Sequence, residues 1–325
     1  MILIADLISP IHLQQIKDLK FTVEYQPKLD EKSFSDFVAN SQPEIIVVRS
    51  RKVTKAHIFS NPKLKAIIRA GAGVDNIDVK SASEKGVQVC NIPGKNSVAV
   101  AELVFAHILS SDRKLPQNYM TLKSGKWNKE DLSKAQGLKG RVLGVIGFGN
   151  IGKEVARRAI GFNMKTVFSS VEYPVGAQVK ILDQVCHSLP LDEVLIQADF
   201  VTLHVPFIKE TTNMINKDFL AKLKKTCVLI NTSRGEVAND EDLLAHLKAN
   251  PDFVYVTDVL RNEPSFKKGD FVSVLAQHPN VYPSCHIGAS TAQAEFAIGE
   301  GLVENLTNFK KTGKLLWVVN PQPKL

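Results

Sequence analysis

The sequence is poor in cysteine. Its 325 residues include four, Cys90, Cys186, Cys227 and Cys285, and no two of them form a C-x-x-C pair. Disulfide frameworks and zinc ribbons need cysteines paired at short spacing, so the sequence predicts neither of them and no metal site. Free thiols fit a reducing compartment, and we therefore expect a cytoplasmic protein.

Long hydrophobic runs are also missing. The N-terminus meets Asp6 too early for a signal peptide, whose apolar core needs about 7–15 residues. The best apolar stretch, 98–109, is interrupted by Glu102 and His107, whereas a membrane-spanning helix needs about 18 or more apolar residues. The sequence therefore predicts a soluble protein that does not enter a membrane.

A dense basic block is missing as well, although 41 Lys and Arg against 33 Asp and Glu give a formal net charge of +8. The lysines are scattered in short groups such as Lys224 with Lys225 and Lys310 with Lys311. Nucleic-acid binders concentrate basic charge, so no nucleic-acid partner is predicted. The excess fits a solvated surface, with mild attraction of an anionic substrate as the alternative.

The sequence does contain an alternation of short β-branched runs with helical stretches, which is typical of parallel sheets covered by helices. The runs predict strands at 2–5, 22–25, 44–49, 64–69, 87–91, 142–146, 166–169, 200–204, 228–231, 254–258 and 281–283. Ser33, Asn239 and Ser290 resemble the N-caps of helices. The length allows about two domains of roughly 100–200 residues each.

A glycine-rich fingerprint lies between a predicted strand and a predicted helix. Gly147, Gly149 and Gly152 form G-x-G-x-x-G directly after the run 142–146. The first glycine permits a tight turn, the second lets a pyrophosphate approach the backbone, and the third allows close helix packing. Free N–H groups at the helix N-terminus would then bind the phosphates. The pattern predicts a dinucleotide cofactor.

The acidic residue that should hold the adenosine ribose is missing from the end of the next strand. Its place falls on Ser170, and Glu172 would face the same side if the strand continued. Without a carboxylate at Ser170, the charge that repels a 2′-phosphate is lost, yet no Lys or Arg lies between 166 and 179 to bind one. We therefore expect NAD as the cofactor, with NADP tolerated.

Three further polar residues, Arg234, Glu263 and His286, each follow a predicted strand, where open α/β sheets bind their ligands. Reduction of a 2-oxo acid requires a proton for the carbonyl oxygen, and a histidine supplies one near neutral pH. A neighbouring carboxylate raises the pKa of such a histidine and fixes its ring. The guanidinium fork of an arginine suits the substrate carboxylate. The sequence predicts that these three residues are catalytic.

These features, together with the segments RAGAGVDNID at 69–78, NIPGKNS at 91–97 and LHVP at 203–206, make the sequence resemble the D-isomer-specific 2-hydroxyacid dehydrogenase family over nearly its whole length. The resemblance implies an α/β fold of two doubly wound parallel-sheet domains. A Rossmann-type cofactor domain, 98–292, would be inserted in a flavodoxin-like substrate domain, 1–97 and 293–325. It also implies a homodimer, with a tetramer as the alternative.

The same resemblance implies the remaining site residues. Cofactor contacts are expected at Gly147, Gly149, Asn150, Ile151, Gly152, Ser170, His204, Val205, Pro206, Thr232, Ser233, Asp258 and Gly288. Substrate contacts are expected at Arg49, Arg51, Arg69, Ala72, Gly73, Val74 and Asn96. In the second set, the glycine-rich loop would close its N–H groups on the substrate carboxylate, and the arginines would bind a phosphate.

Within the family the sequence is most similar to members that oxidise 3-phospho-D-glycerate to 3-phosphohydroxypyruvate with NAD, the first step of serine biosynthesis. A glyoxylate or hydroxypyruvate reductase, another D-2-hydroxyacid dehydrogenase, and an NAD(H)-sensing corepressor-type binding protein are the alternatives. The residues end at Leu325, where longer members add a serine-binding regulatory domain, so no serine feedback is expected. Glu236 stands where a glycine is frequent, so the loop after Arg234 is expected to differ.

Overall fold

A computed structural model of the protein describes residues 1–264 and 269–320. The chain splits into two compact units, which we call unit 1 (Met1–Asn96 with Ser290–Leu325) and unit 2 (Ser97–Ala289). The chain therefore re-enters unit 1 at Ser290, whereas the sequence placed this boundary at residue 293. The helix that follows, α12 (Ala292–Thr312), has Thr291 as its N-cap instead of Ser290, because the Thr291 hydroxyl accepts the Ala294 N–H at 3.1 Å.

Unit 1 is built on a parallel sheet that has five strands among the described residues, in the order β2-β1-β3-β4-β5. The strands are β1 (Ile2–Ile4), β2 (Val23–Tyr25), β3 (Ile45–Val48), β4 (Ala66–Arg69) and β5 (Gln88–Cys90). Their central members are β-branched and buried on both faces, as parallel strands require. The strand order is that of flavodoxin, which confirms the expected doubly wound fold of this unit.

Helices cover both faces of this sheet. They are α1 (Pro10–Asp18), α2 (Glu31–Ser41), α3 (Lys55–Ser60), α4 (Val79–Glu84) and α12. Phe34 of α2 and Ile58 of α3 are buried in one core cluster, whereas Ile16 of α1 is buried with Leu302 and Leu306 of α12 in another. The chain segment before the insertion and the segment after it therefore share one core.

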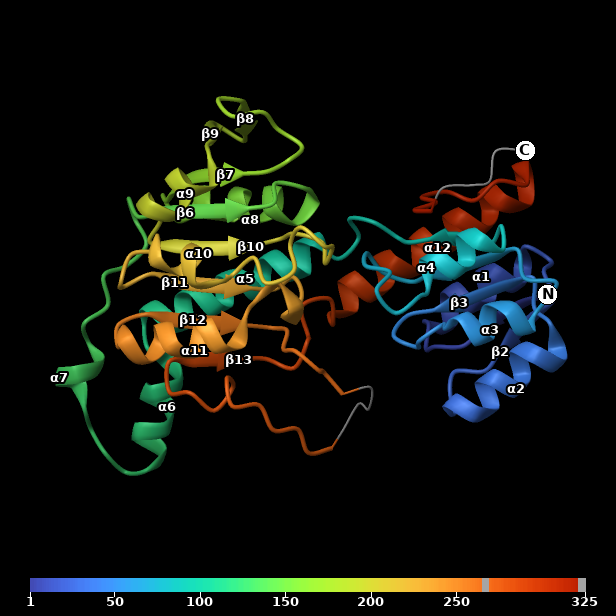
Figure 1. The fold of residues 1–325 in the computed structure, drawn as a ribbon, viewed down its shortest axis with the longest axis horizontal. Helices are drawn as coiled ribbons and strands as arrows, with labels where there is room; N and C mark the ends of the chain where they lie inside the picture. Colours follow the sequence, from blue (N-terminus) through green and yellow to red (C-terminus); the bar gives the residue numbers. More distant parts are fainter. Residues whose placement is uncertain (265–268, 321–325) are drawn as a thin grey trace. The chain divides into compact units, whose positions relative to one another are not determined.

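Unit 2 has, within the described residues, an eight-stranded sheet in the order β13-β12-β11-β10-β6-β7-β9-β8. The strands are β6 (Val142–Ile146), β7 (Lys165–Ser169), β8 (Gln178–Ile181), β9 (Gln184–Ser188), β10 (Phe200–Leu203), β11 (Val228–Asn231), β12 (Val254–Thr257) and β13 (Val281–Pro283). Figure 1 shows this order from β8 at the top to β13 near the lower edge. Strand order reverses direction beside β6, which is the Rossmann arrangement and confirms the expected fold.

The hairpin of β8 and β9 was not expected from the sequence. These two strands pair antiparallel, while β9 pairs parallel with β7. Their residues alternate between exposed positions and half-buried or buried positions, as in Gln178–Ile181, because this edge is covered on one face only. The sheet is thus parallel except at this edge.

The helices and the 3₁₀ turn of unit 2 are α5 (Ser97–Asp112), α6 (Leu115–Lys123), α7 (Lys129–Leu132), α8 (Asn150–Gly161), α9 (Leu191–Gln197), α10 (Lys217–Ala221), η1 (Gly235–Val237) and α11 (Asp240–Ala249). Val104 of α5 and Val155 of α8 are buried in one core cluster. Leu195 of α9, Phe219 of α10 and Leu243 of α11 are buried in a second cluster. The sheet is therefore covered on both faces.

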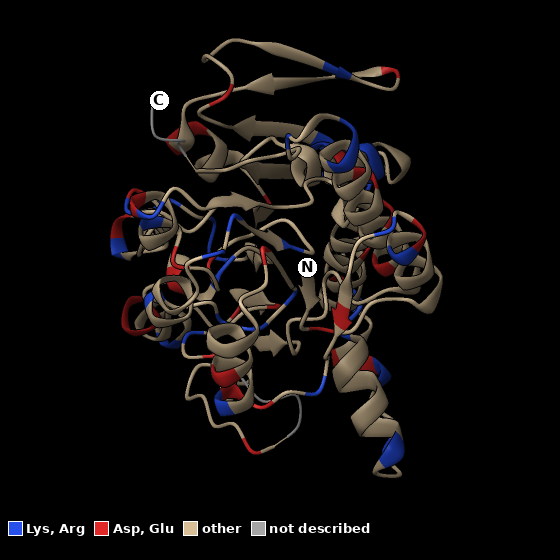
Figure 2. Ribbon diagram, turned by 90° about the vertical axis from the view of Figure 1, so that its right-hand side faces the viewer, with Lys and Arg blue, Asp and Glu red and all other residues tan. Residues whose placement is uncertain are grey.

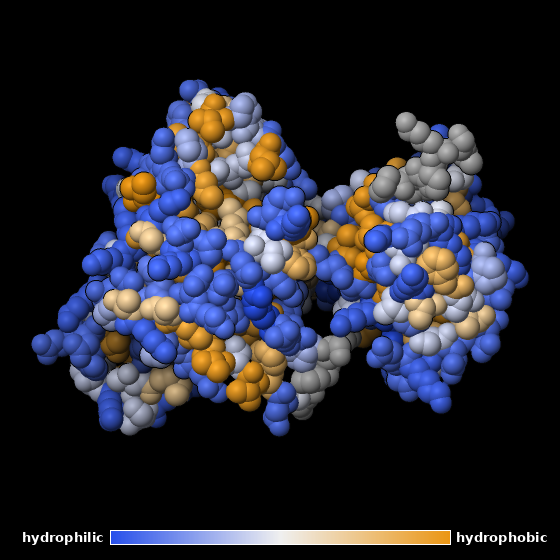
Figure 3. Space-filling view, viewed as in Figure 1, coloured by the Kyte–Doolittle hydropathy of each residue, from blue (hydrophilic) through white to orange (hydrophobic). Residues whose placement is uncertain are grey.

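The surface is mixed in charge. Figure 2 shows Lys and Arg interleaved with Asp and Glu along the helices. Figure 3 shows separate hydrophobic groups on the viewed face, over the β8–β9 hairpin and near the segment between β12 and β13, where Val272 and Val274 are exposed. Among the described residues, no helix is long and apolar enough to cross a membrane.

Candidate active site

The fingerprint glycines have separate geometric roles at the turn from β6 into α8. Gly147 has φ +89°, and a Cβ on it would lie 2.5 Å from the His204 carbonyl oxygen. A Cβ on Gly152 would lie 2.3 Å from the Gly147 carbonyl oxygen, so only glycine allows the helix to pack this closely. A Cβ on Gly149 would meet no described atom within 4 Å. This open approach fits the pyrophosphate of a dinucleotide.

The N-terminus of α8 is arranged to bind an anion. Its first residues are Asn150, Ile151 and Gly152, and its N-cap, Gly149, has no side chain to accept their N–H groups. The first-turn N–H groups of a helix have no partner within the helix, and the helix dipole adds partial positive charge there. The predicted phosphate-binding residues therefore come together at one point of the fold.

The expected ribose position, Ser170, lies just beyond β7. Its hydroxyl accepts the N–H of Glu172 at 3.3 Å, and Val171 between them is fully exposed. Tyr173 turns back into the core and packs edge-on against Phe168. The chain therefore leaves the strand in a turn, so Glu172 does not continue β7 as an extended residue.

His204, one of the predicted cofactor residues, directly follows β10. Burial lowers the pKa of its imidazole to about 3, so the ring is neutral at physiological pH. Its Nε2 lies 3.0 Å from Thr202 Oγ1, and its Nδ1 lies 3.5 Å from Thr232 Oγ1. The imidazole ring thus connects the end of β10 with the end of β11. Val205 and Ser233 are the next residues along the chain after His204 and Thr232.

The three predicted catalytic residues follow neighbouring strands of unit 2: Arg234 after β11, Glu263 after β12 and His286 after β13. His286 Nδ1 lies 2.6 Å from Glu263 Oε2. The other carboxylate oxygen, Oε1, accepts the Leu260 N–H at 2.8 Å. Because Nδ1 is held by the carboxylate and the histidine side chain is 50% exposed, Nε2 is the ring atom that can exchange a proton.

The Glu263 carboxyl is charged at neutral pH. Burial raises its pKa, but the hydrogen bond from His286, the His286 charge, the Leu260 N–H and the Arg234 charge together lower it below the ordinary value. A charged carboxylate can accept the imidazole N–H and stabilise the imidazolium form.

Asp258 holds the loop that carries His286. Its Oδ1 accepts the Ser284 hydroxyl at 2.6 Å and the Ile287 N–H at 2.9 Å, and its Oδ2 accepts the Gly288 N–H at 2.7 Å. The Asp258 carbonyl oxygen accepts the His286 N–H at 2.9 Å. His286 itself has φ +52°, a backbone conformation that side chains rarely adopt, and these bonds support it.

The sequence predicted Asp258 and Gly288 as cofactor contacts and missed this positioning role. The pattern that could have indicated this role is an Asp at the end of one strand and a Ser at the end of the next. From the sequence, we interpreted His107 only as an interruption of an apolar helix. Its Nε2 lies 3.3 Å from Ser284 Oγ, so the histidine extends the same polar network into α5.

In unit 1, Arg49 lies at the end of β3. Its N–H and those of Ser50 and Arg51 all point to Asp6 Oδ2, at 2.7, 3.1 and 3.2 Å. Its guanidinium Nη1 pairs with Glu295 Oε1 at 2.9 Å. The turn is therefore fixed by a carboxylate, and the Arg49 side chain lies on a partly exposed part of the unit.

Arg51 is held by contacts within unit 1. Its Nη2 donates to the Leu29 carbonyl at 2.6 Å, its Nε donates to the Ala5 carbonyl at 3.3 Å, and its guanidinium lies 4.8 Å from the centre of the Phe34 ring. These bonds use two of the three guanidinium nitrogens. The phosphate contact of Arg51 stays a prediction, because a guanidinium has five N–H donors.

The remaining predicted substrate residues lie in and after the glycine-rich loop that follows β4. Arg69 Nε donates to the Arg49 carbonyl at 3.1 Å, and a Cβ on Gly71 would collide with the Arg69 guanidinium. The Ala72 carbonyl accepts the Asn91 amide at 2.6 Å. Gly73 and Val74 follow in this loop, and Asn96 ends the segment before α5.

A family model for the NAD-binding domain of D-isomer-specific 2-hydroxyacid dehydrogenases matches residues 105–288, which is more than half of the chain. The hydroxypyruvate reductase of Thermotoga maritima is 39% identical over 272 residues, or 83% of this chain and 85% of the relative. The chain belongs to this family. It is an enzyme, and NAD is its cofactor, which confirms those two expectations.

Other members of the dehydrogenase family match over nearly the whole chain. The D-3-phosphoglycerate dehydrogenase of Rattus norvegicus is 34% identical over 324 residues, covering 99% of this chain but 58% of the relative, so the chain spans a little over half of that protein. A solved D-lactate dehydrogenase of Aquifex aeolicus with NAD and lactic acid has a TM-score of 0.81 and 27% identity, covering 98% of this chain and 100% of its own. These members differ in their named substrates.

Proposed function

We propose that this enzyme transfers hydride between NAD and a small 2-hydroxy acid, with His286 as the proton acceptor and donor. Glu263 holds the imidazole, and Arg234 orients the substrate carboxylate. The observation that carries the proposal is the 2.6 Å contact between His286 Nδ1 and Glu263 Oε2, at the sheet edge where β6 leads into the dinucleotide fingerprint. Open α/β sheets bind ligands at this edge.

The chain's own residues would handle the proton and the carboxylate. NAD, when bound, accepts the hydride from the carbon that carries the hydroxyl group. His286 Nε2 takes the hydroxyl proton, and the charged Glu263 stabilises the resulting imidazolium. Arg234 remains cationic throughout and binds the carboxylate with its planar fork. In the reverse direction, His286 returns the proton to the carbonyl oxygen.

We further propose 3-phospho-D-glycerate as the substrate, oxidised to 3-phosphohydroxypyruvate in the first step of serine biosynthesis. Similarity to a D-3-phosphoglycerate dehydrogenase over 99% of this chain supports this choice. Arg49 and Arg69, at the ends of β3 and β4, supply cations for the phosphate. Reduction of unphosphorylated hydroxypyruvate is the second candidate, because the Thermotoga relative has that name at 39% identity.

Arg49→Met distinguishes the two substrates. We expect the KM for 3-phosphohydroxypyruvate to rise about tenfold or more, while the KM for hydroxypyruvate changes little, since only the first has a phosphate to lose a charge-assisted bond. Lys52→Met, which removes a neighbouring exposed cation, is the matched control. Equal effects of Arg49→Met on both substrates would contradict the phosphate assignment and favour the unphosphorylated acid.

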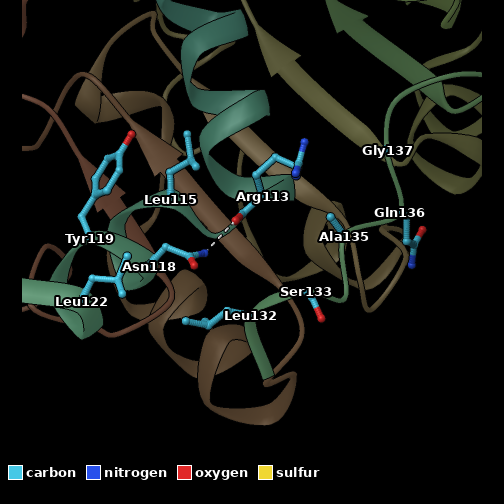
Figure 4. A pocket seen from close by; sticks show the side chains of 10 residues that line it. All are labelled: Arg113, Leu115, Asn118, Tyr119, Leu122, Leu132, Ser133, Ala135, Gln136 and Gly137. Carbon is cyan, nitrogen blue, oxygen red and sulfur yellow. Dashed lines mark hydrogen bonds between the residues drawn. The ribbon is translucent and has the colours of Figure 1, made fainter. Parts of the chain in front are cut away.

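We also propose a homodimer in the cytoplasm. Three of the four cysteines are buried and all four are free, which suits a reducing compartment. The segment of α6 and α7 forms a groove of about 600 Å³, and Figure 4 shows Leu115, Tyr119, Leu122 and Leu132 around it. Nearby Trp127 is 80% exposed. This apolar segment supplies the surface by which a second copy would bind.

A further inference from the structure

The loops that carry Arg234 and Glu263 touch one another backbone to backbone. Gly235 follows Arg234, and a Cβ on it would lie 2.3 Å from the Leu260 carbonyl carbon and 2.6 Å from the Arg261 nitrogen. Leu260 is also the residue whose N–H binds the Glu263 carboxylate. The two loops therefore meet where each one fixes its own catalytic side chain.

Arg261 ties this junction together. Its Nε donates to the Ala238 carbonyl at 2.7 Å, and its Nη2 donates to the Glu236 carbonyl at 3.0 Å and to Asn213 Oδ1. Its Nε lies 3.7 Å from Asp240 Oδ1. One guanidinium from the Glu263 loop thus holds η1, the turn that begins directly after Arg234.

The backbone carbonyl of Glu236 belongs to the same junction. Glu236, which stands where a glycine is frequent, enters a 3₁₀ turn, and its carbonyl oxygen accepts both the Arg261 guanidinium and the Asn213 N–H, the latter at 3.0 Å. The carbonyl groups of this turn point toward one place. Donors are needed there, because buried carbonyl oxygens without donors are costly. Arg261 supplies five potential donors in a rigid plane, which an ammonium cannot match.

We propose that Arg261 is a positioning residue that sets Arg234 relative to Glu263 and His286. This inference rests on the proposed function of that site. Arg261 does not take part in proton transfer. It fixes the loop of the carboxylate-binding arginine against the loop of the acid–base pair, so that substrate carboxylate and imidazole are presented at the correct separation.

The first test compares Arg261→Met and Arg261→Lys with Arg141→Met. Arg141 is a matched control, since its guanidinium is also partly buried in unit 2 and pairs with Asp112 at 3.2 Å, at the start of β6. For glyoxylate reduction we expect Arg261→Met to lower kcat/KM about 100-fold and to weaken inhibition by oxamate, because small misplacement of a reacting group is costly. NADH affinity, measured by fluorescence, should not change.

Arg261→Lys should fall between Arg261→Met and the wild type, because one ammonium can satisfy a carbonyl but cannot span the turn. Arg141→Met should lower the melting temperature while kcat/KM stays within about threefold of the wild type. Should Arg261→Met fail to fold, Arg261→Lys carries the same comparison. The proposal would be overturned if Arg261→Lys had the same oxamate inhibition and the same kcat/KM as the wild type.

A double-mutant cycle with Arg234→Lys then tests the route of the effect. If Arg261 acts through Arg234, Arg261→Met should reduce kcat/KM much less in the Arg234→Lys background than in the wild type. An equal reduction in both backgrounds would overturn the positioning role. Failure of the proposed function gives a different result, since the wild type would then reduce no 2-oxo acid, or Arg234→Lys alone would have no effect.

Discussion

Single residues in this site are held from two sides. His286 is bound through its ring to Glu263 and through its N–H to the Asp258 carbonyl, and Glu263 is bound in turn by the Leu260 N–H. The sequence could single out Arg234, Glu263 and His286 as candidates because each side chain has the chemistry that proton transfer or carboxylate binding needs. It could not identify Arg261 or the second role of Asp258, because these act through backbone groups that no residue pattern displays.

Replacing Glu263 tests the acid–base pair. We expect Glu263→Gln to lower kcat about tenfold or more, because the neutral amide does not stabilise the imidazolium. The pKa of Glu263 is lowered in the folded protein, so its charged form stabilises the fold above the ordinary carboxyl range, and this contribution is lost as pH falls through the folded pKa. The difference in melting temperature between wild type and Glu263→Gln should therefore shrink on acidification. A constant difference down to strongly acidic pH would contradict the pairing.

Asp258→Asn tests the support of the His286 loop. The buried carboxylate accepts three donors, whereas an amide would place its own N–H groups against some of them. We expect a loss of about 1.5–3 kcal/mol in the free energy of unfolding, measured by urea denaturation, together with lower kcat. Ser284→Ala, which removes one of the three donors, should cost less. Unchanged stability of Asp258→Asn would show that the loop does not depend on this carboxylate.

At the scale of elements, the predicted strands agree with the structure wherever the strand is buried on both faces, as in β3, β6 and β11. The β8–β9 hairpin was missed because its alternating polar residues give a weaker signal than a continuous apolar run. The predicted cap Asn239 is confirmed at α11, whereas the caps predicted at Ser33 and Ser290 are wrong by one to three residues. Asp30 rather than Ser33 caps α2, and both types can accept an N–H, so the backbone angle decides between them.

We propose that the turn after β7 sets the choice between NAD and NADP. Ser170 presents no charge to the 2′ position, so we propose that NADPH is tolerated. Ser170→Asp should raise the ratio of kcat/KM for NADH to that for NADPH by about tenfold, because a carboxylate repels the 2′-phosphate. Ser170→Asn is the uncharged control. An unchanged ratio in Ser170→Asp would mean that the cofactor's ribose lies elsewhere.

In the whole molecule, the described residues form two doubly wound units with separate cores, and the first unit is completed by α12 from the C-terminal part of the sequence. The insertion could be anticipated only from family resemblance, because no composition change marks residues 97 and 290. The phosphate contact of Arg51 also rests on resemblance alone. Within unit 1 its guanidinium lies against the Phe34 ring and donates to two carbonyl groups, which no residue pattern displays.

The homodimer contact proposed for the apolar segment of α6 and α7 can be tested directly. If it forms the homodimer contact, Trp127→Glu together with Met120→Glu should shift the protein from dimer to monomer in analytical ultracentrifugation, since both residues are exposed and hydrophobic. Phe59→Glu, at an exposed site in unit 1, is the control. A dimer that survives both substitutions would place the interface on another surface.

The most direct test of the central claim follows NADH absorbance during reduction of glyoxylate, hydroxypyruvate and 3-phosphohydroxypyruvate by the wild type and by His286→Ala, with NADH binding measured in parallel. The wild type should turn over at least one of these acids, and His286→Ala should bind NADH normally but lose about 100- to 10,000-fold in kcat. Unchanged turnover in His286→Ala would contradict the mechanism. NADH binding without turnover of any acid by the wild type would contradict the enzymatic function itself.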